Sequence, residues 1–398
     1  MKPLDGIRVL DLSRVLAGPW CTQLLADLGA EVIKIERPLV GDDTRHWGPP
    51  WFGSGEERVA AYFLSCNRGK KSVAIDFAKA DGASLVRNLA ARADVVVENF
   101  KVGGLKKSGL DAGTLCSLNP RLVYASITGF GQDGPYAERA GYDFIIQGMG
   151  GMMSVTGLPD GEPGGGPMRA GVAIADLFTG MYTCASILAA LFRRERTGKG
   201  TSIDMALFDT QLAVMANQAS NALVSGRDPP RQGNTHPNIV PYQPFNASDQ
   251  PIIIAVGNDR QFARLADICG HPEWAGDERF SSNESRVANR NAIVELVSRA
   301  IGQRPAAQWL EALERAGIPA GPINTLTQAF SDVQAQHRKM VSTIAGVPQV
   351  GSPVCLDGER AGSDLPPPAL GEHTAAVLET LGLPPKELER LRAAEVIS

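Results

Sequence analysis

One carboxylate stands alone in a long apolar run near the middle of the chain. Between Arg169 and Glu195 the only acidic residue is Asp176, in the stretch AGVAIADLFTGMYTCASILAALFRR. The residues after it have helical spacing, so Asp176 could cap a helix, and pattern alone favours that structural interpretation. A carboxylate beside an apolar wall can instead act as a nucleophile, because a desolvated and well-aimed aspartate forms acyl intermediates.

The elements that must position this residue alternate between strand and helix. Buried strands are predicted at 7–12, 31–37, 71–77, 94–100 and 121–130, and helices at 17–29, 79–93 and 110–118. Strand, helix and strand within about thirty residues form a right-handed crossover, which predicts a parallel, doubly wound α/β sheet. The first turn, SRVLAGPW, lacks the Gly-x-Gly-x-x-Gly pattern of dinucleotide-binding proteins.

The amino-acid composition of the chain changes after residue 225. The Gly- and Pro-rich stretch SGRDPPRQGNTHPN indicates a linker, and a short strand with three amphipathic helices follows it. We therefore expect a Rossmann-like large domain that begins with 1–225, a smaller α+β domain at 226–325, and a return segment, 326–398, that completes the large domain.

Composition limits the possible partners. The 398-residue chain has a net charge of −4, which disfavours nucleic acid as a partner. Its six cysteines are scattered and its five histidines are isolated, so we expect reduced thiols, a cytoplasmic location and no metal site. We expect no membrane span, because no uninterrupted apolar run approaches the ~18 residues that a span requires.

Several motifs in a fixed order resemble the class III CoA-transferases, the formyl-CoA and carnitine CoA-transferase type. The resemblance covers nearly the whole chain and rests on GIRVLDLSRVLAGPWCTQLLADLGAEVIKIERP, NRGKKSVAIDF, DVVVENF, SITGFGQDGPYAERAGYDFIIQGMGGMMSVTG, GVAIADLFTGMY, RTGKGTSIDMALFD and PALGEHT. The resemblance implies that Asp176 is the nucleophile. In this family the aspartate forms a mixed anhydride with the donor acyl group and then an aspartyl-CoA thioester. No permanently bound cofactor is implied, since coenzyme A and acyl-CoA are substrates.

The resemblance also implies which residues contact coenzyme A. The positions that match the family are Arg37 and Lys70 or Lys71 near the adenosine phosphates, Asn99 and Phe100 at the adenine and pantetheine walls, Lys107, and Tyr142 and Asp143 in a loop close to the nucleophile. Lys107 stands where formyl-CoA transferases have arginine, and a single ammonium replaces a bidentate guanidinium there.

Two alternatives to a transferase remain open. The α-methylacyl-CoA racemases share the fold and the aspartate, but they pair it with a histidine in a Gly-His-Asp motif. This chain has Tyr142 at that place, and a tyrosine phenol, which ionises near pH ~10, is a poor base at neutral pH. The second alternative is a CoA-binding protein without activity, which the intact Asp176 and the Gly-Tyr-Asp motif argue against.

A further set of residues bears on which carboxylic acids the enzyme would accept. Leu16 stands where formyl-CoA transferases have glutamine, and the motifs look more like the succinyl-CoA-dependent branch, whose acceptors are often dicarboxylic acids. A distal carboxylate could pair with Arg14, Arg45 or Arg169, or these arginines could form structural ion pairs. The family architecture further implies an interlocked homodimer, in which two chains thread through each other.

Overall fold

The chain divides into two compact units in the computed structural model, which describes residues 2–55 and 58–398. Unit 1 comprises Met1–Met152, Ala170–Ser220 and Val333–Ser398, and unit 2 comprises Met153–Arg169 and Asn221–Asp332. The predicted small domain, 226–325, falls within unit 2, which also takes in 153–169, 221–225 and 326–332. The return segment thus begins at 333 and not at 326.

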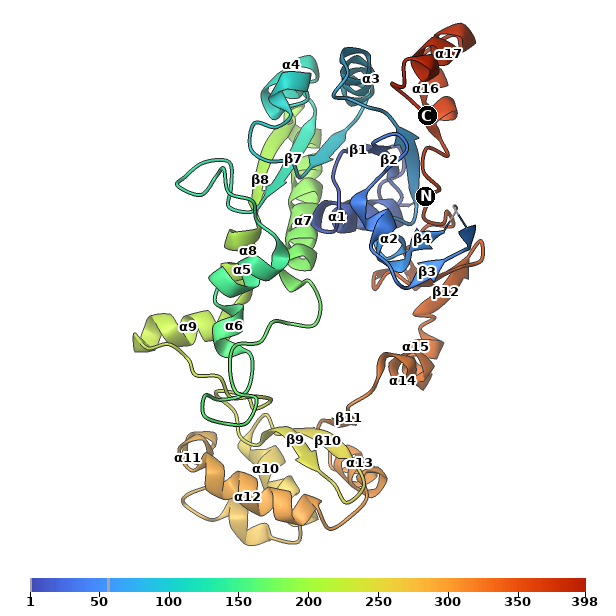
Figure 1. The fold of residues 1–398 in the computed structure, drawn as a ribbon. Helices are drawn as coiled ribbons and strands as arrows, with labels where there is room; N and C mark the ends of the chain where they lie inside the picture. The colour runs from blue at the N-terminus through green and yellow to red at the C-terminus, as the bar shows by residue number, and fades with distance from the viewer. Residues whose placement is uncertain (1, 56–57) are drawn as a thin grey trace. The chain divides into compact units, whose positions relative to one another are not determined.

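Unit 1 is built around a six-stranded parallel sheet with the strand order β5-β2-β1-β6-β7-β8 (Figure 1). The strands are β1 (Arg8–Asp11), β2 (Glu31–Glu36), β5 (Lys70–Ala74), β6 (Val95–Glu98), β7 (Val123–Thr128) and β8 (Thr201–Ala206). From β1 the chain adds β2 and β5 on one side, and it then adds β6, β7 and β8 on the other side. The connections after β1 and β6 therefore diverge, and a crevice opens between them at the carboxyl ends of these two strands. The predicted doubly wound α/β fold is confirmed.

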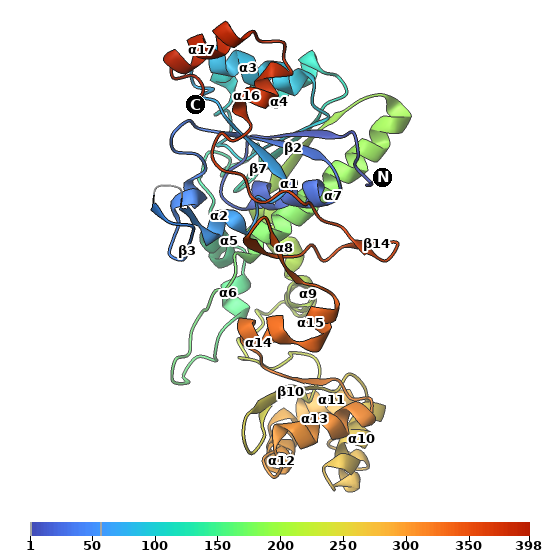
Figure 2. The same ribbon diagram turned by 90° about the vertical axis from the view of Figure 1, so that its right-hand side faces the viewer.

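Helices cover both faces of this sheet (Figure 2). One face packs on α1 (Ala17–Asp27) and α7 (Ile174–Thr197), and the other packs on α3 (Ala80–Ala91), α4 (Ala112–Leu118), α16 (Thr374–Glu379) and α17 (Pro385–Ala393). Alternate residues of a strand serve the two layers: Val95 and Val97 face α1 and α7, whereas Val96 faces the opposite core. The C-terminal segment thus completes the core of unit 1.

The last strand of the sheet, β8, has no counterpart in the sequence-based prediction. Its side chains alternate between half-buried and exposed positions, and Ser202 and Asp204 face solvent. Such an alternation is typical of an edge strand and lacks the continuous apolar run of the central strands. Sequence patterns of this kind are weaker signals for a strand.

The longest helix, α7, carries Asp176 in its first turn. By length and composition alone it could cross a membrane, the one such helix in the described part of the chain. Here it packs against α1 and the sheet through Ala175, Cys184 and Ile187. A core helix of a globular domain has the same apolar character, so its composition is explained by this packing.

Unit 2 has a core of its own. Its antiparallel sheet has the order β11-β10-β9 and is covered by four helices. The elements are β9 (Tyr242–Asn246), β10 (Pro251–Ala255), β11 (Ala320–Pro322), α10 (Asp259–Ile268), α11 (Asn283–Ala288), α12 (Arg290–Ile301) and α13 (Ala306–Arg315). The strand and the three amphipathic helices expected from the sequence correspond to β10, α10, α12 and α13.

Shorter elements connect these parts. They are β3 (Trp51–Phe52), β4 (Val59–Ala60), α2 (Ala61–Leu64), α5 (Asp143–Met149), α6 (Met152–Val155), α8 (Leu207–Val214), α9 (Ala216–Ser225), α14 (Leu326–Ser331), α15 (Val333–His337), β12 (Val341–Ile344), β13 (Val347–Val350), β14 (Cys355–Leu356), β15 (Glu359–Arg360) and the 3-10 helices η1 (Asp43–His46), η3 (Lys106–Ser108) and η4 (Pro272–Ala275).

Candidate active site

Asp176 lies in the first turn of α7, but it does not cap that helix. The N-cap residue is Ala173, and no side chain within the turn accepts the free amides. Instead Asp143 Oδ1 accepts the amide protons of Ala175 at 2.8 Å and of Asp176 at 3.4 Å. The interpretation of Asp176 as a cap is therefore wrong: Asp143, from the start of α5, performs that role. The residues just before α7 form a loop, so Asp176 does not lie at a junction between a strand and a helix.

A buried glutamine holds Asp143 in place. Gln147, one helical turn further along α5, donates from Nε2 to Asp143 Oδ2 at 2.7 Å. Its own Oε1 accepts the amide proton of Ala170 at 2.9 Å, just before α7. Asp143 Oδ1 is thus occupied by the first amides of α7 and Oδ2 by Gln147 of its own helix. The Asp176 carboxylate is left without a hydrogen-bond donor among the described residues.

The environment of Asp176 makes its charged form costly. Burial raises the pKa of this carboxyl to about 7, and repulsion from the Asp143 carboxylate adds to the effect. At neutral pH a large fraction of Asp176 is therefore ionised but poorly solvated. A carboxylate in this state is a better nucleophile than one that is hydrated or paired with a cation.

Asp176 lines a cavity of about 440 Å³ at the carboxyl edge of the sheet. The walls come from the ends of β1, β6 and β7, from the segment before α5, and from the start of α8. Of the residues singled out in the sequence, this cavity brings together Arg14, Leu16, Asn99, Phe100, Tyr142 and Asp176. These residues are far apart in the chain, and the sheet topology unites them.

Asn99 joins the two loops at the point where the strand order reverses. Its Oδ1 accepts the amide proton of Arg14 at 2.8 Å, and its Nδ2 donates to the carbonyl of Arg14 at 2.7 Å. The Arg14 guanidinium lies over the ring of Phe100, 5.1 Å from its centroid, and also pairs with Asp43 at 3.2 Å. Asn99 therefore fixes the backbone between the cavity walls.

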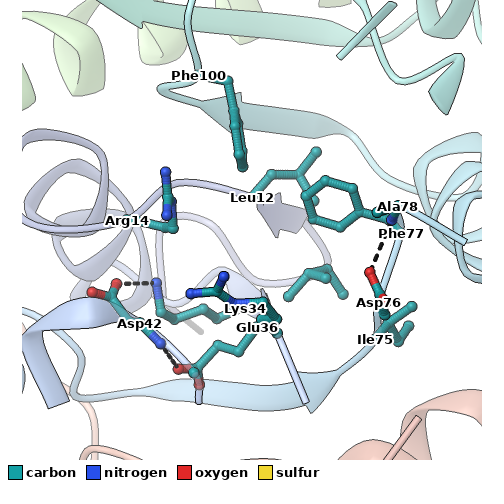
Figure 3. A pocket seen from close by; sticks show the side chains of 13 residues that line it. Leu12, Arg14, Lys34, Glu36, Asp42, Ile75, Asp76, Phe77, Ala78 and Phe100 are labelled. Carbon is teal, nitrogen blue, oxygen red and sulfur yellow. Dashed lines mark hydrogen bonds and ion pairs between the residues drawn. The ribbon is translucent and has the colours of Figure 1, made fainter. Parts of the chain in front are cut away.

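A second cavity, of about 190 Å³, opens beyond Phe100 at the ends of β1, β2 and β5 (Figure 3). Arg14 and Phe100 line both cavities, so the two adjoin. The Phe77 ring meets Phe100 edge to face at 5.7 Å, and Arg37 lies at the rim, 57% exposed. Aromatic walls with an exposed guanidinium suit a ligand that has a flat ring and an anionic group.

Lys70 does not reach this surface. Its ammonium is buried inside the sheet, 3.1 Å from Asp11, and also donates to the carbonyl of Pro19 at 3.0 Å and to Asn67 Oδ1 at 2.9 Å. All three protons are occupied, so the expectation that Lys70 contacts a phosphate is not supported. The adjacent Lys71 is half-exposed and pairs with Glu31 at 2.7 Å.

Arg45 is also part of the framework. It is buried and pairs with Glu36, at 2.7 Å, while its guanidinium covers the Phe63 ring at 3.7 Å. Of the two interpretations that the sequence left open for Arg45, the structure supports the structural ion pair and not the contact with a substrate carboxylate. Lys107 is exposed on η3, and Arg169 belongs to unit 2. The roles of these last two residues stay predictions.

Replacement of Lys70 by methionine is expected to destabilise the fold. The variant leaves the Asp11 carboxylate buried and unpaired, a change that costs about 3–5 kcal/mol. Lys71→Met is the matched control, because loss of its half-exposed ion pair costs at most ~1 kcal/mol. Urea denaturation measures both free energies of unfolding. A Lys70→Met protein of normal stability with a raised KM for CoA esters would restore Lys70 as a ligand contact.

The structure adds residues that sequence reasoning missed. Lys101 and Arg139 line the Asp176 cavity, and Phe77 lines the second one. Phe77 is the last residue of one predicted strand and Lys101 directly follows another, so their place at the carboxyl ends was a usable signal. The capping role of Asp143 had no local signal, because its partners are more than thirty residues away.

Comparison with known proteins agrees with this geometry. The chain matches CoA-transferase family III over residues 4–374. The chain belongs to this family. It is a CoA-transferase, and the two cavities and Asp176 form its candidate active site.

Individual relatives cover nearly the whole of this CoA-transferase. It is 50% identical to the succinate–glutarate CoA-transferase of Agrobacterium fabrum, over 95% of this chain and 96% of the relative. It is 39% identical to the human succinyl-CoA:glutarate CoA-transferase, over 100% and 90% of the two chains. A crystal structure of a CAIB/BAIF family protein from Brucella suis superposes with a TM-score of 0.85 at 53% identity, over 96% and 99%.

Proposed function

We propose that this CoA-transferase moves CoA from succinyl-CoA to a dicarboxylic acid such as glutarate, through covalent intermediates on Asp176. The observation that carries the proposal is the Asp176 carboxylate, which is unpaired, poorly solvated and placed in a cavity that adjoins a second one suited to a nucleotide. The names of the relatives support the choice of succinyl-CoA and glutarate.

In this mechanism Asp176 attacks the thioester carbonyl of succinyl-CoA. The carbon–sulfur bond breaks, CoA thiolate leaves, and a mixed anhydride joins Asp176 to the succinyl group. The thiolate then attacks the aspartyl carbonyl, which gives an aspartyl-CoA thioester and releases succinate. The acceptor carboxylate repeats both exchanges in reverse order. Since each step exchanges one activated acyl bond for another, no ATP is consumed.

The adjoining cavities fit the two ends of an acyl-CoA. The adenosine part would occupy the cavity lined by Phe77, Phe100 and Arg37, and the pantetheine arm would pass Phe100 toward Asp176. Arg37 is exposed and 3.8 Å from Asp43, so a phosphate could replace that loose contact at little cost. Lys71 lies at the amino end of β5 and pairs with Glu31 at the amino end of β2, away from both cavities, so the structure does not support it as a phosphate contact. Lys107 remains a candidate for an outer contact with the phosphates.

Arg37→Ala is expected to raise the KM of acyl-CoA substrates about 10-fold with little change in kcat, because the contact is the same in the ground and transition states. Steady-state assays with succinyl-CoA and with its 3′-dephospho analogue measure the effect. If Arg37 holds the terminal phosphate, the variant should lose affinity only for the complete ester. An equal loss of affinity for both esters would mean that Arg37 contacts a part of CoA other than the terminal phosphate. An unchanged KM would mean that Arg37 does not contact the substrate.

The racemase alternative has less support. Tyr142 takes the place of the histidine base, and relatives that match nearly the whole chain are named as CoA-transferases. A direct test incubates the purified protein with succinyl-CoA and glutarate and follows CoA esters by chromatography, beside a 2-methylacyl-CoA in deuterated water. Glutaryl-CoA without deuterium exchange supports the transferase, and the opposite result supports the racemase.

The functional form in this proposal is an interlocked homodimer. Large apolar side chains are exposed on α5 and α7, among them Ile145, Met149, Met181, Tyr182 and Phe192, and a second copy would cover such a surface. Light scattering at nanomolar concentration should give twice the mass of one chain. Two differently tagged preparations should not exchange subunits without denaturant, whereas a folded monomer or rapid exchange would contradict interlocking.

A further inference from the structure

The cavity around Asp176 has an excess of positive charge. Asp176 is the one carboxylate among its described lining residues, whereas Arg14, Lys101 and Arg139 bring three cations. Once Asp176 is acylated, its own negative charge is lost as well. A cavity of this kind favours a substrate that keeps a negative charge away from its reacting end.

The three cations are not equally available. Arg14 pairs with Asp43 at 3.2 Å and stands where the two cavities meet, on the side proposed for coenzyme A. Lys101 carries its charge on a flexible and strongly hydrated ammonium group, which cannot bind a carboxylate through two fixed parallel hydrogen bonds. Arg139 has no carboxylate within ion-pair distance among the described residues. Its planar guanidinium can bind a carboxylate through two parallel hydrogen bonds.

Arg139 is exposed, and stacking on Tyr136 orients its guanidinium before any ligand binds. Its guanidinium lies 3.9 Å from the centroid of the Tyr136 ring, and its amide donates to the Tyr136 carbonyl at 2.9 Å. Tyr136 is in turn packed edge to face on Phe130, with ring centroids 5.5 Å apart. Stacking fixes the plane of the guanidinium, and its N–H edge is left to bind a ligand.

The backbone after Arg139 is also fixed. Gly141 packs directly on Gly129 at the end of β7, so closely that a Cβ on Gly141 would lie 2.4 Å from the Gly129 Cα. Two residues later Asp143 caps α7. The backbone that follows Arg139 is therefore tied to the sheet through Gly141 and to the helix of the nucleophile through Asp143.

We propose that Arg139 selects dicarboxylic over monocarboxylic substrates by pairing with the carboxylate remote from the reacting one. This inference rests on the proposed transferase function and assigns the specificity to one residue. Apolar side chains such as Leu16, Ile127 and Leu207 line the same cavity and suit the methylene groups between the two carboxylates. A monocarboxylic acid would leave the Arg139 guanidinium without a partner in the occupied site.

The test is an internal competition between two acceptors. Wild-type enzyme with succinyl-CoA and an equimolar mixture of glutarate and butyrate yields glutaryl-CoA and butyryl-CoA, and their ratio reports the relative kcat/KM. Because both acceptors meet the same aspartyl-CoA enzyme, damage to the donor half-reaction cancels. We expect Arg139→Leu to lower the ratio about 100-fold and Arg139→Lys to lower it about 10-fold.

Two controls make the outcome decisive. Arg196 is stacked on Phe192 at the other end of α7, 4.3 Å from the ring centroid, and Arg196→Leu should leave the product ratio unchanged. The inhibition constant of free CoA should be the same for wild type and Arg139→Leu. An unchanged ratio in Arg139→Leu, or equal slowing with both acceptors, would overturn the proposal for Arg139. A wild-type enzyme that makes neither product would instead overturn the proposed function.

Discussion

Asp176→Asn is expected to lower CoA transfer by about four orders of magnitude or more, since removal of a covalent nucleophile eliminates the catalysed route. The amide keeps the size of the side chain but lacks the nucleophilic oxygen. In the described residues no other carboxylate lines the cavity, so no neighbour can substitute for it. The measurement is the turnover of succinyl-CoA with glutarate, with product checked for deamidation of the variant by mass spectrometry.

The stability of the same variant separates a catalytic role from a structural one. Asp143 and not Asp176 caps α7, so the substitution removes no cap. The raised pKa means that the folded protein binds a proton more tightly than the unfolded chain, and stability falls as the pH rises from about 4 to about 7. We therefore expect Asp176→Asn to be about 1–3 kcal/mol more stable than wild type at pH 8. A clear loss of stability, with transfer retained, would make Asp176 a structural residue.

The second large effect is expected at Asp143. Asp143→Ala removes the acceptor for the amides of Ala175 and Asp176, so the first turn of α7 loses its fixed position. Displacement of a reacting group by about 1 Å can cost ~100-fold in rate, and we expect kcat to fall by about that factor. Loss of the cap should also cost about 1–2 kcal/mol in stability.

Asp143→Asn distinguishes the two contributions of this residue. Asparagine can still accept the backbone protons through Oδ1, but its Nδ2 cannot accept the hydrogen bond from Gln147, and it carries no charge to raise the pKa of Asp176. In wild type we expect kcat/KM for succinyl-CoA to fall below pH 7, because protonated Asp176 cannot attack. In Asp143→Asn this acid limb should move to lower pH while kcat is largely kept. An unmoved limb would contradict the electrostatic contribution of Asp143, and full activity in Asp143→Ala would contradict its positioning role.

The sheet was predictable because its central strands are continuous apolar runs between helices of regular period. Val95, Val96 and Val97 are all buried, and no alternative element explains such a run. The edge strand β8 escaped notice because Ala206 is the one fully buried residue among its six. Periodicity therefore identified the core, and it became unreliable where the structure meets solvent.

The site was predictable in part, and its errors share one cause. Lys70 and Arg45 have the sequence appearance of surface cations, yet Asp11 and Glu36 pair with them in the interior. A buried lysine or arginine is uncommon, and only the fold reveals the distant partner that makes it tolerable. Arg139 escaped for the opposite reason: nothing in the sequence around it indicates that it lines the cavity of the nucleophile.

The most direct test of covalent catalysis follows an oxygen atom through a single turnover. Enzyme is mixed with succinyl-CoA and with glutarate whose carboxylates carry oxygen-18, and the peptide containing Asp176 is then analysed by mass spectrometry. When CoA thiolate attacks the glutaryl carbonyl of the second anhydride, the bridging oxygen from glutarate stays on Asp176. The account predicts one oxygen-18 atom in that peptide, at Asp176. Glutaryl-CoA formed with an unlabelled Asp176, and with the heavy oxygen carried directly into succinate, would contradict it.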